Sequence, residues 1–343
     1  MKSIHMNRQL SATDMESSAL SSSDVLADIR HLKQYFPIRG GLLGRVVHHV
    51  KAVDDISFQI HAGETLSIVG ESGCGKSTTG RSILRLDDPT SGEIYFQGKN
   101  ILELNKAELK RMRKDMQIIF QDPFASLNPR QTVRQILKEA LEIQKVVPRS
   151  KQDERIRELM DNVGLRPEHI DRLPHEFSGG QRQRIGIARA LALEPRLIIC
   201  DEAVSALDVS IQAQIINLLK KLQKQHQLTY LFISHDLGVV RHISDRVIVM
   251  YLGTIVEIAD KKSLFDRPQH PYTRALLSSI PSTKRNQPKE RIQLTGDVPS
   301  PIHPPSGCRF HTRCPFAVDR CSSEVPELRT IHEGHRAACH LIS

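Results

Sequence analysis

A glycine-rich segment after a short apolar stretch constrains the fold of this chain more than any other feature. Residues 65–70 read TLSIVG, as in a buried strand, and residues 70–78 read GESGCGKST. The second segment matches the pattern G-x-x-x-x-G-K-[ST], which is informative when it lies between a strand and a helix. Its glycines let successive backbone N–H groups turn toward one anion at a helix N-terminus, so it predicts a phosphate-binding loop, or P-loop.

The P-loop also offers side chains to a nucleotide. Lys76 is expected to contact the β- and γ-phosphates, and Ser77 to ligate Mg²⁺. Cys74 falls where the pattern accepts any residue, and we expect no chemistry from its thiol. The alternative is a Gly-rich turn without a ligand. The expected nucleotide-binding residues of the loop are Gly70, Ser72, Gly73, Cys74, Gly75, Lys76, Ser77 and Thr78.

Two acidic residues end another apolar stretch. Residues 197–201 read LIICD and predict a buried strand, so Asp201 and Glu202 lie at its carboxyl end, where ligands bind in open α/β sheets. Asp201 is expected to hold Mg²⁺ through its water shell, and Glu202 to polarise the attacking water. A carboxylate pair on the protein surface is the alternative.

Two further polar residues follow predicted strands. Gln121 closes the strand at 116–120 and could contact Mg²⁺ and the attacking water. His235 follows the strand at 229–234 and could bond the γ-phosphate, although an isolated histidine is more often structural. The expected catalytic residues are Lys76, Gln121, Glu202 and His235.

A second anion-binding feature lies within residues 175–190, which read HEFSGGQRQRIGIARA. Ser178 is a good N-cap, and the N–H groups of the first helical turn, which contains Gly179 and Gly180, can hold an anion. The alternative is that Ser178 only caps the helix.

Strand and helix patterns predict an α/β fold. Alternating residues at 29–38 and 50–60 predict antiparallel strands, and helical spacing between 131 and 163 indicates a helical insertion. Apolar strands that alternate with amphipathic helices, such as 210–226, are typical of a parallel sheet covered on both faces. Pro-rich, charged sequence from residue 281 onward indicates a domain boundary.

Charge and composition argue against several classes of protein. The net charge of +9 is scattered, and with 4% aromatic residues the chain lacks the stacking platform of a single-strand binder, so we expect no nucleic-acid partner. The longest apolar run, 247–253, is far shorter than the roughly 20 residues that span a bilayer. We expect residues 1–25 to be a disordered tail without a secretory signal.

Together, GESGCGKST, Gln121, FSGGQ, LIICDE, SALD and His235 resemble the nucleotide-binding subunit of an ABC transporter, in the family's order. The resemblance implies a P-loop NTPase fold over residues 26–280, with a parallel core sheet, an antiparallel β subdomain and a helical subdomain at about 122–182. It implies ATP and Mg²⁺ as cofactors. Ala203 departs from the family, which usually has proline there, but this change removes no reactive group.

The resemblance also implies that two subunits pack head to tail around ATP. The segment at 178–181 of one subunit would close over the γ-phosphate held by the other, and Asp208 of SALD would lie where the halves communicate. The residues expected to act across this contact are Ser178, Gly179, Gly180, Gln181 and Asp208.

Adenine in this family usually stacks on an aromatic residue of the first strand. Tyr35 is the expected residue, and Phe36 is the second choice. His48 or His49, in the loop between the first strands, could also come near the ring.

The C-terminal part is similar to that of one group of ABC proteins. Residues 267–281, RPQHPYTRALLSSIP, and the later TGDVPSPIHPPSGCRFHTRCP are similar to the extension of ATP-binding subunits from dipeptide and oligopeptide importers, including nickel relatives. We place this extension at 281–343. SLNPR at 126–130 and the long N-terminal loop resemble the F-type of the two paired ATPases.

Four cysteines lie in this extension. Four thiolates in a segment with little core of its own suit a metal in a reducing cytosol better than disulfides. Their spacing lacks the C-x₂-C pairs of common zinc ribbons. Importers of this type include subunits whose corresponding cysteines hold an iron–sulfur cluster, so we expect [4Fe–4S], with zinc or no metal as alternatives. The expected ligands are Cys308, Cys314, Cys321 and Cys339.

The resemblance implies an ATPase subunit that energises peptide import. We expect it on the cytoplasmic face of a bacterial inner membrane, with a second, paralogous ABC ATPase and two transmembrane permease subunits. An extracytoplasmic peptide-binding protein would be an indirect partner. ATP binding would close the ATPase dimer, and hydrolysis would reopen it. Nickel or haem import, and a soluble non-transport ABC ATPase, are the alternatives.

Overall fold

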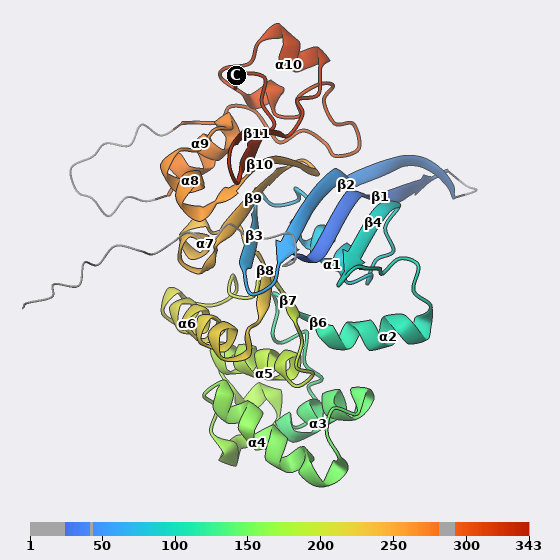
Figure 1. The fold of residues 1–343 in the computed structure, drawn as a ribbon, viewed down its shortest axis with the longest axis vertical. Helices are drawn as coiled ribbons and strands as arrows, with labels where there is room; N and C mark the ends of the chain where they lie inside the picture. The colour runs from blue at the N-terminus through green and yellow to red at the C-terminus, as the bar shows by residue number, and fades with distance from the viewer. Residues whose placement is uncertain (1–24, 42–43, 281–291, 343) are drawn as a thin grey trace, which may run out of the picture.

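The computed structural model describes residues 25–41, 44–280 and 292–342. Figure 1 shows two β-sheets in the upper half of the molecule, a group of helices at its lower end and the C-terminal part at its top. The tail expected at 1–25 lies, apart from Val25, outside the described residues.

The larger sheet carries the ends of strands on which the site is built. Its strands are β3 (Thr65–Val69), β6 (Met116–Ile119), β7 (Leu197–Asp201), β8 (Thr229–Ile233), β9 (Arg246–Tyr251), β10 (Thr254–Asp260), β11 (Arg329–His332) and β12 (His335–Ala337). They lie in the order β11-β12-β10-β9-β3-β8-β7-β6, and β9, β3, β8, β7 and β6 are parallel neighbours. Every residue of β3, β7 and β8 is buried, which confirms the predicted parallel core sheet.

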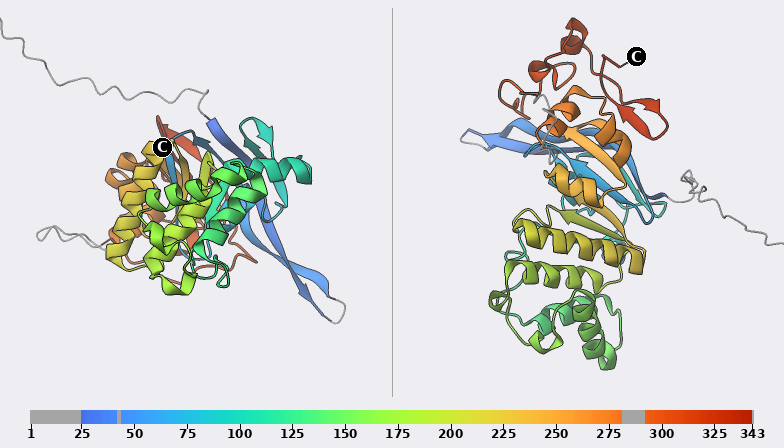
Figure 2. Two further views of the ribbon diagram at one scale, coloured as in Figure 1. Left: turned by 90° about the horizontal axis from the view of Figure 1, so that it is seen from below. Right: turned by 90° about the vertical axis from the view of Figure 1, so that its left-hand side faces the viewer.

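The smaller sheet is antiparallel. It contains β1 (Val25–Gly40), β2 (Arg45–His61), β4 (Ser91–Phe96) and β5 (Lys99–Asn100) in the order β2-β1-β4-β5. The predicted antiparallel pair is confirmed, but β1 and β2 run beyond 29–38 and 50–60 at both ends. Figure 2 shows the far end of this hairpin projecting from the body.

Helices cover the larger sheet and form the lower end of the molecule (Figure 1). They are α1 (Lys76–Ile83), α2 (Lys106–Asp115), α3 (Val133–Gln144), α4 (Gln152–Asn162), α5 (Gly179–Leu191), α6 (Val209–His226), α7 (Leu237–Ile243), α8 (Lys261–Asp266), α9 (Pro271–Ser278) and α10 (Asp319–Ser323). The helical pattern at 131–163 is two helices, because Lys145 adopts a left-handed φ of 51° after α3 and Pro148 follows. A Thr132 capping box starts α3.

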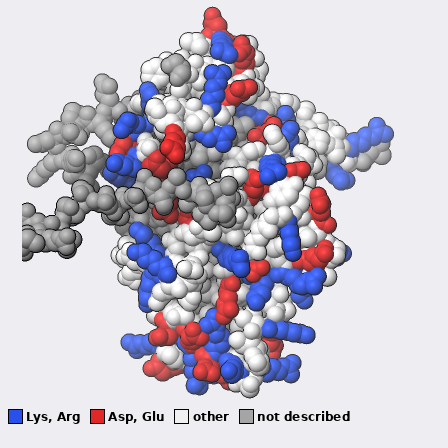
Figure 3. Space-filling model, viewed as in Figure 1, with Lys and Arg blue, Asp and Glu red and all other residues white. Residues whose placement is uncertain are grey.

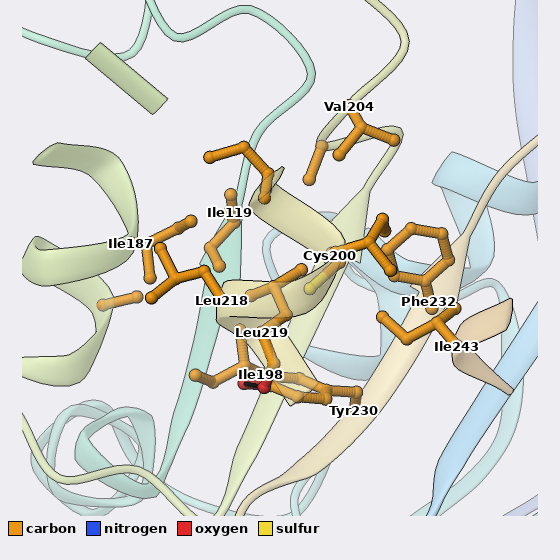
Figure 4. Packing of buried hydrophobic residues seen from close by; sticks show 14 of the residues in the cluster. Ile119, Ile187, Ile198, Cys200, Val204, Leu218, Leu219, Tyr230, Phe232 and Ile243 are labelled. Carbon is orange, nitrogen blue, oxygen red and sulfur yellow. Dashed lines mark hydrogen bonds between the residues drawn. The ribbon is translucent and has the colours of Figure 1, made fainter. Parts of the chain in front are cut away.

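The parallel strands β3, β7 and β8 of the larger sheet are buried on both faces. One core cluster packs α5 and α6 against it through residues such as Ile187, Leu219 and Tyr230, as Figure 4 shows. The other cluster lies between the two sheets and includes Ile29 and Ile199. Neighbouring residues of β7 therefore face opposite cores, which fixes the strand firmly where it ends at the site.

Charges are mixed on the surface. In the view of Figure 3, Lys and Arg are interspersed with Asp and Glu over much of the visible face. Among the described residues, the helices are all too short or too polar to cross a membrane.

The C-terminal part joins the larger sheet. β12 pairs with β10, and Ala338 donates a backbone hydrogen bond to Val256. Beneath this contact the carboxylate of Glu257 accepts a 2.8 Å hydrogen bond from the ring of His335, and both side chains are buried. The expected boundary at residue 281 falls within 281–291, outside the described residues.

Candidate nucleotide-binding and hydrolysis site

The P-loop follows β3 and leads into α1. Gly70 and Gly75 have positive φ angles of 154° and 103°. A Cβ atom at Gly70 would lie 2.2 Å from the carbonyl oxygen of Met250, and one at Gly75 would lie 2.1 Å from that of Ala52. Both positions therefore require glycine, and the loop backbone packs directly on β9 and β2.

The side chain of Lys76 is buried against the backbone of the P-loop. Its Nζ donates hydrogen bonds to the carbonyl oxygens of Gly70, at 2.9 Å, and Glu71, at 3.0 Å. α1 begins at Lys76 without a side-chain cap, so N–H groups of its first turn remain available to a phosphate. The loop thus combines a cation, free N–H groups and a helix N-terminus, which suits a polyphosphate.

Two of the three residues expected to contact Mg²⁺, Ser77 and Asp201, lie together, whereas the third, Gln121, bonds Glu202. The hydroxyl of Ser77 donates a 2.6 Å hydrogen bond to Asp201 at the end of β7. Burial raises the pKa of Asp201, although the hydrogen bond from Ser77 opposes that effect. A divalent cation beside this buried carboxylate would favour its charged form.

Side chains that follow three neighbouring strands meet at Glu202, the residue after β7. Gln121, which follows β6, donates a 3.0 Å hydrogen bond from Nε2 to Oε2 of Glu202. Nδ1 of His235, which follows β8, lies 3.2 Å from the same oxygen. The backbone of Glu202 has a positive φ of 48°, a left-handed conformation that is uncommon for residues other than glycine.

The segment at 178–181 starts α5. Ser178 and Gln181 form a capping box, with bonds of 3.0 and 3.4 Å between each side chain and the other residue's N–H. A Cβ atom at Gly180 would lie 2.5 Å from Cγ2 of Ile211. Asp208 in turn caps α6 by accepting hydrogen bonds from the N–H of Ile211, at 2.9 Å, and from Ser210. Hydrogen bonding, first from Ser210, lowers the pKa of Asp208.

This segment and the P-loop are separate within one chain. Across the described parts of the protein, no hydrogen bond or ion pair joins residues 178–181 to residues 70–78. The structure therefore brings together Ser77 with Asp201, and Gln121 with Glu202 and His235, but leaves the second anion-binding feature apart from them.

Tyr35 lies in β1 opposite Lys51 of β2, and its hydroxyl is engaged in a hydrogen bond. It donates a hydrogen bond to Asp54, which also accepts one from Arg309. Burial, and then this bond to Asp54, raises the pKa of Tyr35 to about 12. Phe36 is 38% exposed, and the ring of His48 meets that of His303 edge to face.

The four tail cysteines gather in one part of the structure. The N–H of Cys308 donates a 2.8 Å hydrogen bond to the carbonyl of Cys321. Burial raises the pKa of Cys308 to about 11, and the nearby thiols of Cys321, Cys339 and Cys314 add to the effect. In the parts of the chain that the structure covers, no three His, Cys, Asp or Glu side chains are arranged to hold a metal ion.

Sequence reasoning missed an ion pair at the P-loop. Arg313, which ends the 3₁₀ turn η5 (His311–Arg313), forms an ion pair with Glu71. The only signal in the sequence is an arginine between two cysteines of the tail, which by itself indicates a solvated charge.

Family comparisons agree with this geometry. The family model described as ABC transporter matches residues 53–205, and that of the oligopeptide/dipeptide transporter C-terminal region matches residues 256–321. The oligopeptide transport ATP-binding protein AppF of Bacillus subtilis (strain 168) is 56% identical, over 94% of this chain and 99% of its own length. A putative peptide import ATP-binding protein of Brucella ovis is 55% identical, over 92% and 97%.

Solved structures show the same fold. The cbiO1 protein from Clostridium perfringens, part of the ABC transporter complex cbiONQ, is 27% identical with a TM-score of 0.61, over 71% of this chain and 92% of that one. The ATP-binding cassette MJ0796, in a dimeric post-hydrolysis state bound to ADP and Pi, is 28% identical with a TM-score of 0.60, over 68% and 98%. With a 56% identical relative along nearly its whole length, the chain belongs to the ABC transporter family, among the ATP-binding proteins that carry the oligopeptide/dipeptide transporter C-terminal region.

Proposed function

We propose that this chain is the ATP-hydrolysing subunit of an ABC importer for dipeptides or oligopeptides. The observation that carries the proposal is the convergence of Gln121 and His235 on Glu202, beside the Ser77–Asp201 pair. These are the groups that hydrolysis of the β–γ bond of MgATP needs. The names of the relatives above, an oligopeptide transport and a peptide import protein, support peptide as the cargo.

Hydrolysis requires a second subunit in this proposal. Lys76, Ser77 and Asp201 hold MgATP on one chain. Glu202 polarises the attacking water, Gln121 contacts this water and Mg²⁺, and His235 bonds the γ-phosphate. Residues 178–181 act on the γ-phosphate bound by the partner, which accounts for their separation from the chain's own P-loop. ATP therefore joins two subunits, and Asp208, which packs near residues 178–181, links the two halves.

The assembled transporter follows from this pairing. The partner is a paralogous ABC ATPase, with this chain as the F-type, and both bind two transmembrane permeases on the cytoplasmic face of a bacterial inner membrane. Closure of the ATPase pair on ATP and its reopening after hydrolysis switch the permeases between outward- and inward-facing states. Peptide reaches them from an extracytoplasmic binding protein. Tyr35 contacts adenine from β1.

Co-purification with the membrane subunits tests the proposal. The complex is reconstituted in vesicles, and uptake of a labelled dipeptide, a labelled oligopeptide, nickel and haem is compared. ATP-dependent uptake of peptide, abolished by E202Q, is expected. Uptake of nickel or haem instead would replace the cargo, and ATP hydrolysis by an isolated monomer at a rate independent of concentration would exclude the two-subunit site.

Cys308, Cys314, Cys321 and Cys339 are the proposed ligands of a [4Fe–4S] cluster. Four thiols in one small part of the chain suit such a cluster, but the arrangement described above is not a formed metal site. The absorption spectrum and the iron and sulfide contents of anaerobically purified protein test this assignment. Protein without iron and sulfide rejects the cluster, and zinc in its place would select the alternative.

A further inference from the structure

The P-loop is held from outside by the C-terminal region. Arg313 donates hydrogen bonds to both carboxylate oxygens of Glu71, at 2.8 and 3.3 Å. The N–H of Glu71 donates a 2.9 Å hydrogen bond to the hydroxyl of Tyr272 in α9. Arg313 and Tyr272 both lie within residues 256–321, which match the oligopeptide/dipeptide transporter C-terminal region. One loop residue therefore has its side chain and its backbone fixed by this region.

The groups that hold Glu71 are themselves rigid. Tyr272 is fully buried, and the side chain of Arg313 is only 8% exposed. The rings of Tyr251, Tyr272 and Phe310 pack against one another with centroids 4.8 to 5.3 Å apart, and the guanidinium of Arg313 lies 6.0 Å from the centre of the Tyr251 ring. A bidentate bond from a buried arginine fixes direction as well as distance.

Glu71 also contacts Lys76, so fixing Glu71 also restrains the lysine. Its carbonyl oxygen accepts a 3.0 Å hydrogen bond from Nζ of Lys76, the cation expected to contact the phosphates. The loop also contains Gly70, Gly73 and Gly75, whose conformational freedom makes ordering costly. A loop that is already ordered binds a polyphosphate more tightly, because it loses less conformational entropy when the ligand binds.

We propose that Arg313 is a positioning residue for nucleotide binding, which through Glu71 holds the P-loop in the conformation that receives the phosphates of a nucleoside di- or triphosphate. The C-terminal region is then the outer wall of the nucleotide site. This inference goes beyond the proposed function, because it concerns the nucleotide affinity of the chain itself. Its test does not depend on which cargo the transporter carries.

Calorimetric titration of the full chain with MgADP tests the inference without hydrolysis. R313Q is expected to raise the dissociation constant about tenfold, the scale of one charge-assisted pair. E71Q should raise it by a similar factor while leaving the packing of the C-terminal region intact. R320Q is the matched control, because Arg320 of α10 lies in the same region but forms an exposed ion pair with Glu324, the residue after that helix. The R320Q variant should bind MgADP with the same affinity as the unchanged chain.

The double variant separates positioning from a general structural role. If Arg313 acts through Glu71, adding R313Q to E71Q weakens MgADP binding no further. In the assembled ATPase, R313Q should raise KM for ATP and leave kcat within about twofold. Unchanged MgADP affinity in E71Q, or losses that multiply in the double variant, would overturn the inference. The E71Q result decides the matter even if R313Q fails to fold.

Discussion

Ser77 and Asp201, 124 residues apart in sequence, meet through a 2.6 Å hydrogen bond between hydroxyl and carboxylate. The bond ties the first turn of α1 to the end of β7, where Asp201 is 6% exposed. Two oxygen donors of this kind at a P-loop suit the partly hydrated Mg²⁺ that accompanies ATP.

Replacing Asp201 by asparagine should abolish the Mg²⁺ dependence of ATP hydrolysis. D201N keeps the shape and a hydrogen-bond acceptor for Ser77 but removes the negative charge, so we expect hydrolysis to fall by about 100-fold or more. Initial rates across a Mg²⁺ titration measure the effect. D153N is the control, because Asp153 is an exposed partner of Arg134 far from the P-loop. Equal rates for D201N and the unchanged chain would remove Asp201 from the site.

Replacing Glu202 by glutamine should trap ATP. E202Q retains hydrogen-bonding groups for Gln121 and His235 but cannot act as a base, so ATP should hold the two ATPase subunits together. Size-exclusion chromatography with MgATP should show a stable dimer with the partner, and phosphate release should fall to background. Normal turnover by E202Q would contradict the role of Glu202.

Two glycines of α5 should respond oppositely to alanine. A Cβ atom at Gly180 meets Ile211 at 2.5 Å, so G180A should displace residues 178–181 and reduce ATP-dependent dimerisation, with MgADP affinity unchanged. G186A is the control, because a Cβ atom there meets nothing within 4 Å. It should raise the free energy of unfolding by about 1 kcal/mol through helix propensity. Full dimerisation by G180A would speak against a role for this segment at the subunit contact.

Acid should destabilise the chain through His270. Burial lowers the pKa of His270 to about 4, and its Nδ1 accepts a hydrogen bond from Tyr272, so the folded state keeps the ring neutral. The unfolded ring takes up a proton as pH falls below about 6.5, whereas the folded ring does so only near pH 4. The free energy of unfolding is therefore unaffected by this group above pH 6.5, and it falls by roughly 3 kcal/mol as pH drops from 6.5 toward 4.

Thermal unfolding between pH 7 and pH 4 measures this effect. H270N keeps a side chain that can cap α9 but cannot titrate, so its stability should depend less steeply on pH across this range. Parallel curves for H270N and the unchanged chain would show that another group is responsible.

Residues at the ends of single elements could be predicted from the sequence. Gly70 through Thr78 follow a buried strand, and apolar runs lead to Gln121, Asp201 and His235. In open α/β sheets, ligands bind at the carboxyl ends of such strands. Short-range pattern therefore located each group, and the parallel sheet brought them together.

Contacts between distant segments could not be predicted in this way. Arg313 and Glu71 are 242 residues apart, and each alone has the sequence context of an ordinary surface charge. β12, which pairs with β10, is only three residues long, too short for a periodic pattern. The break between α3 and α4 was likewise hidden within a helical pattern, since the left-handed conformation of Lys145, which ends α3, has no signal in the sequence.

The pairing of β10 with β12 bears on how this protein can be handled. Residues 255–259 of β10 are buried in a row, with β9 along one side and β12 along the other. A shortened chain that stops at residue 280 would present that apolar strand with a row of unpaired backbone groups, ready to recruit the same strand from another molecule. Such fragments should precipitate on expression, so the catalytic part cannot be prepared by trimming the tail.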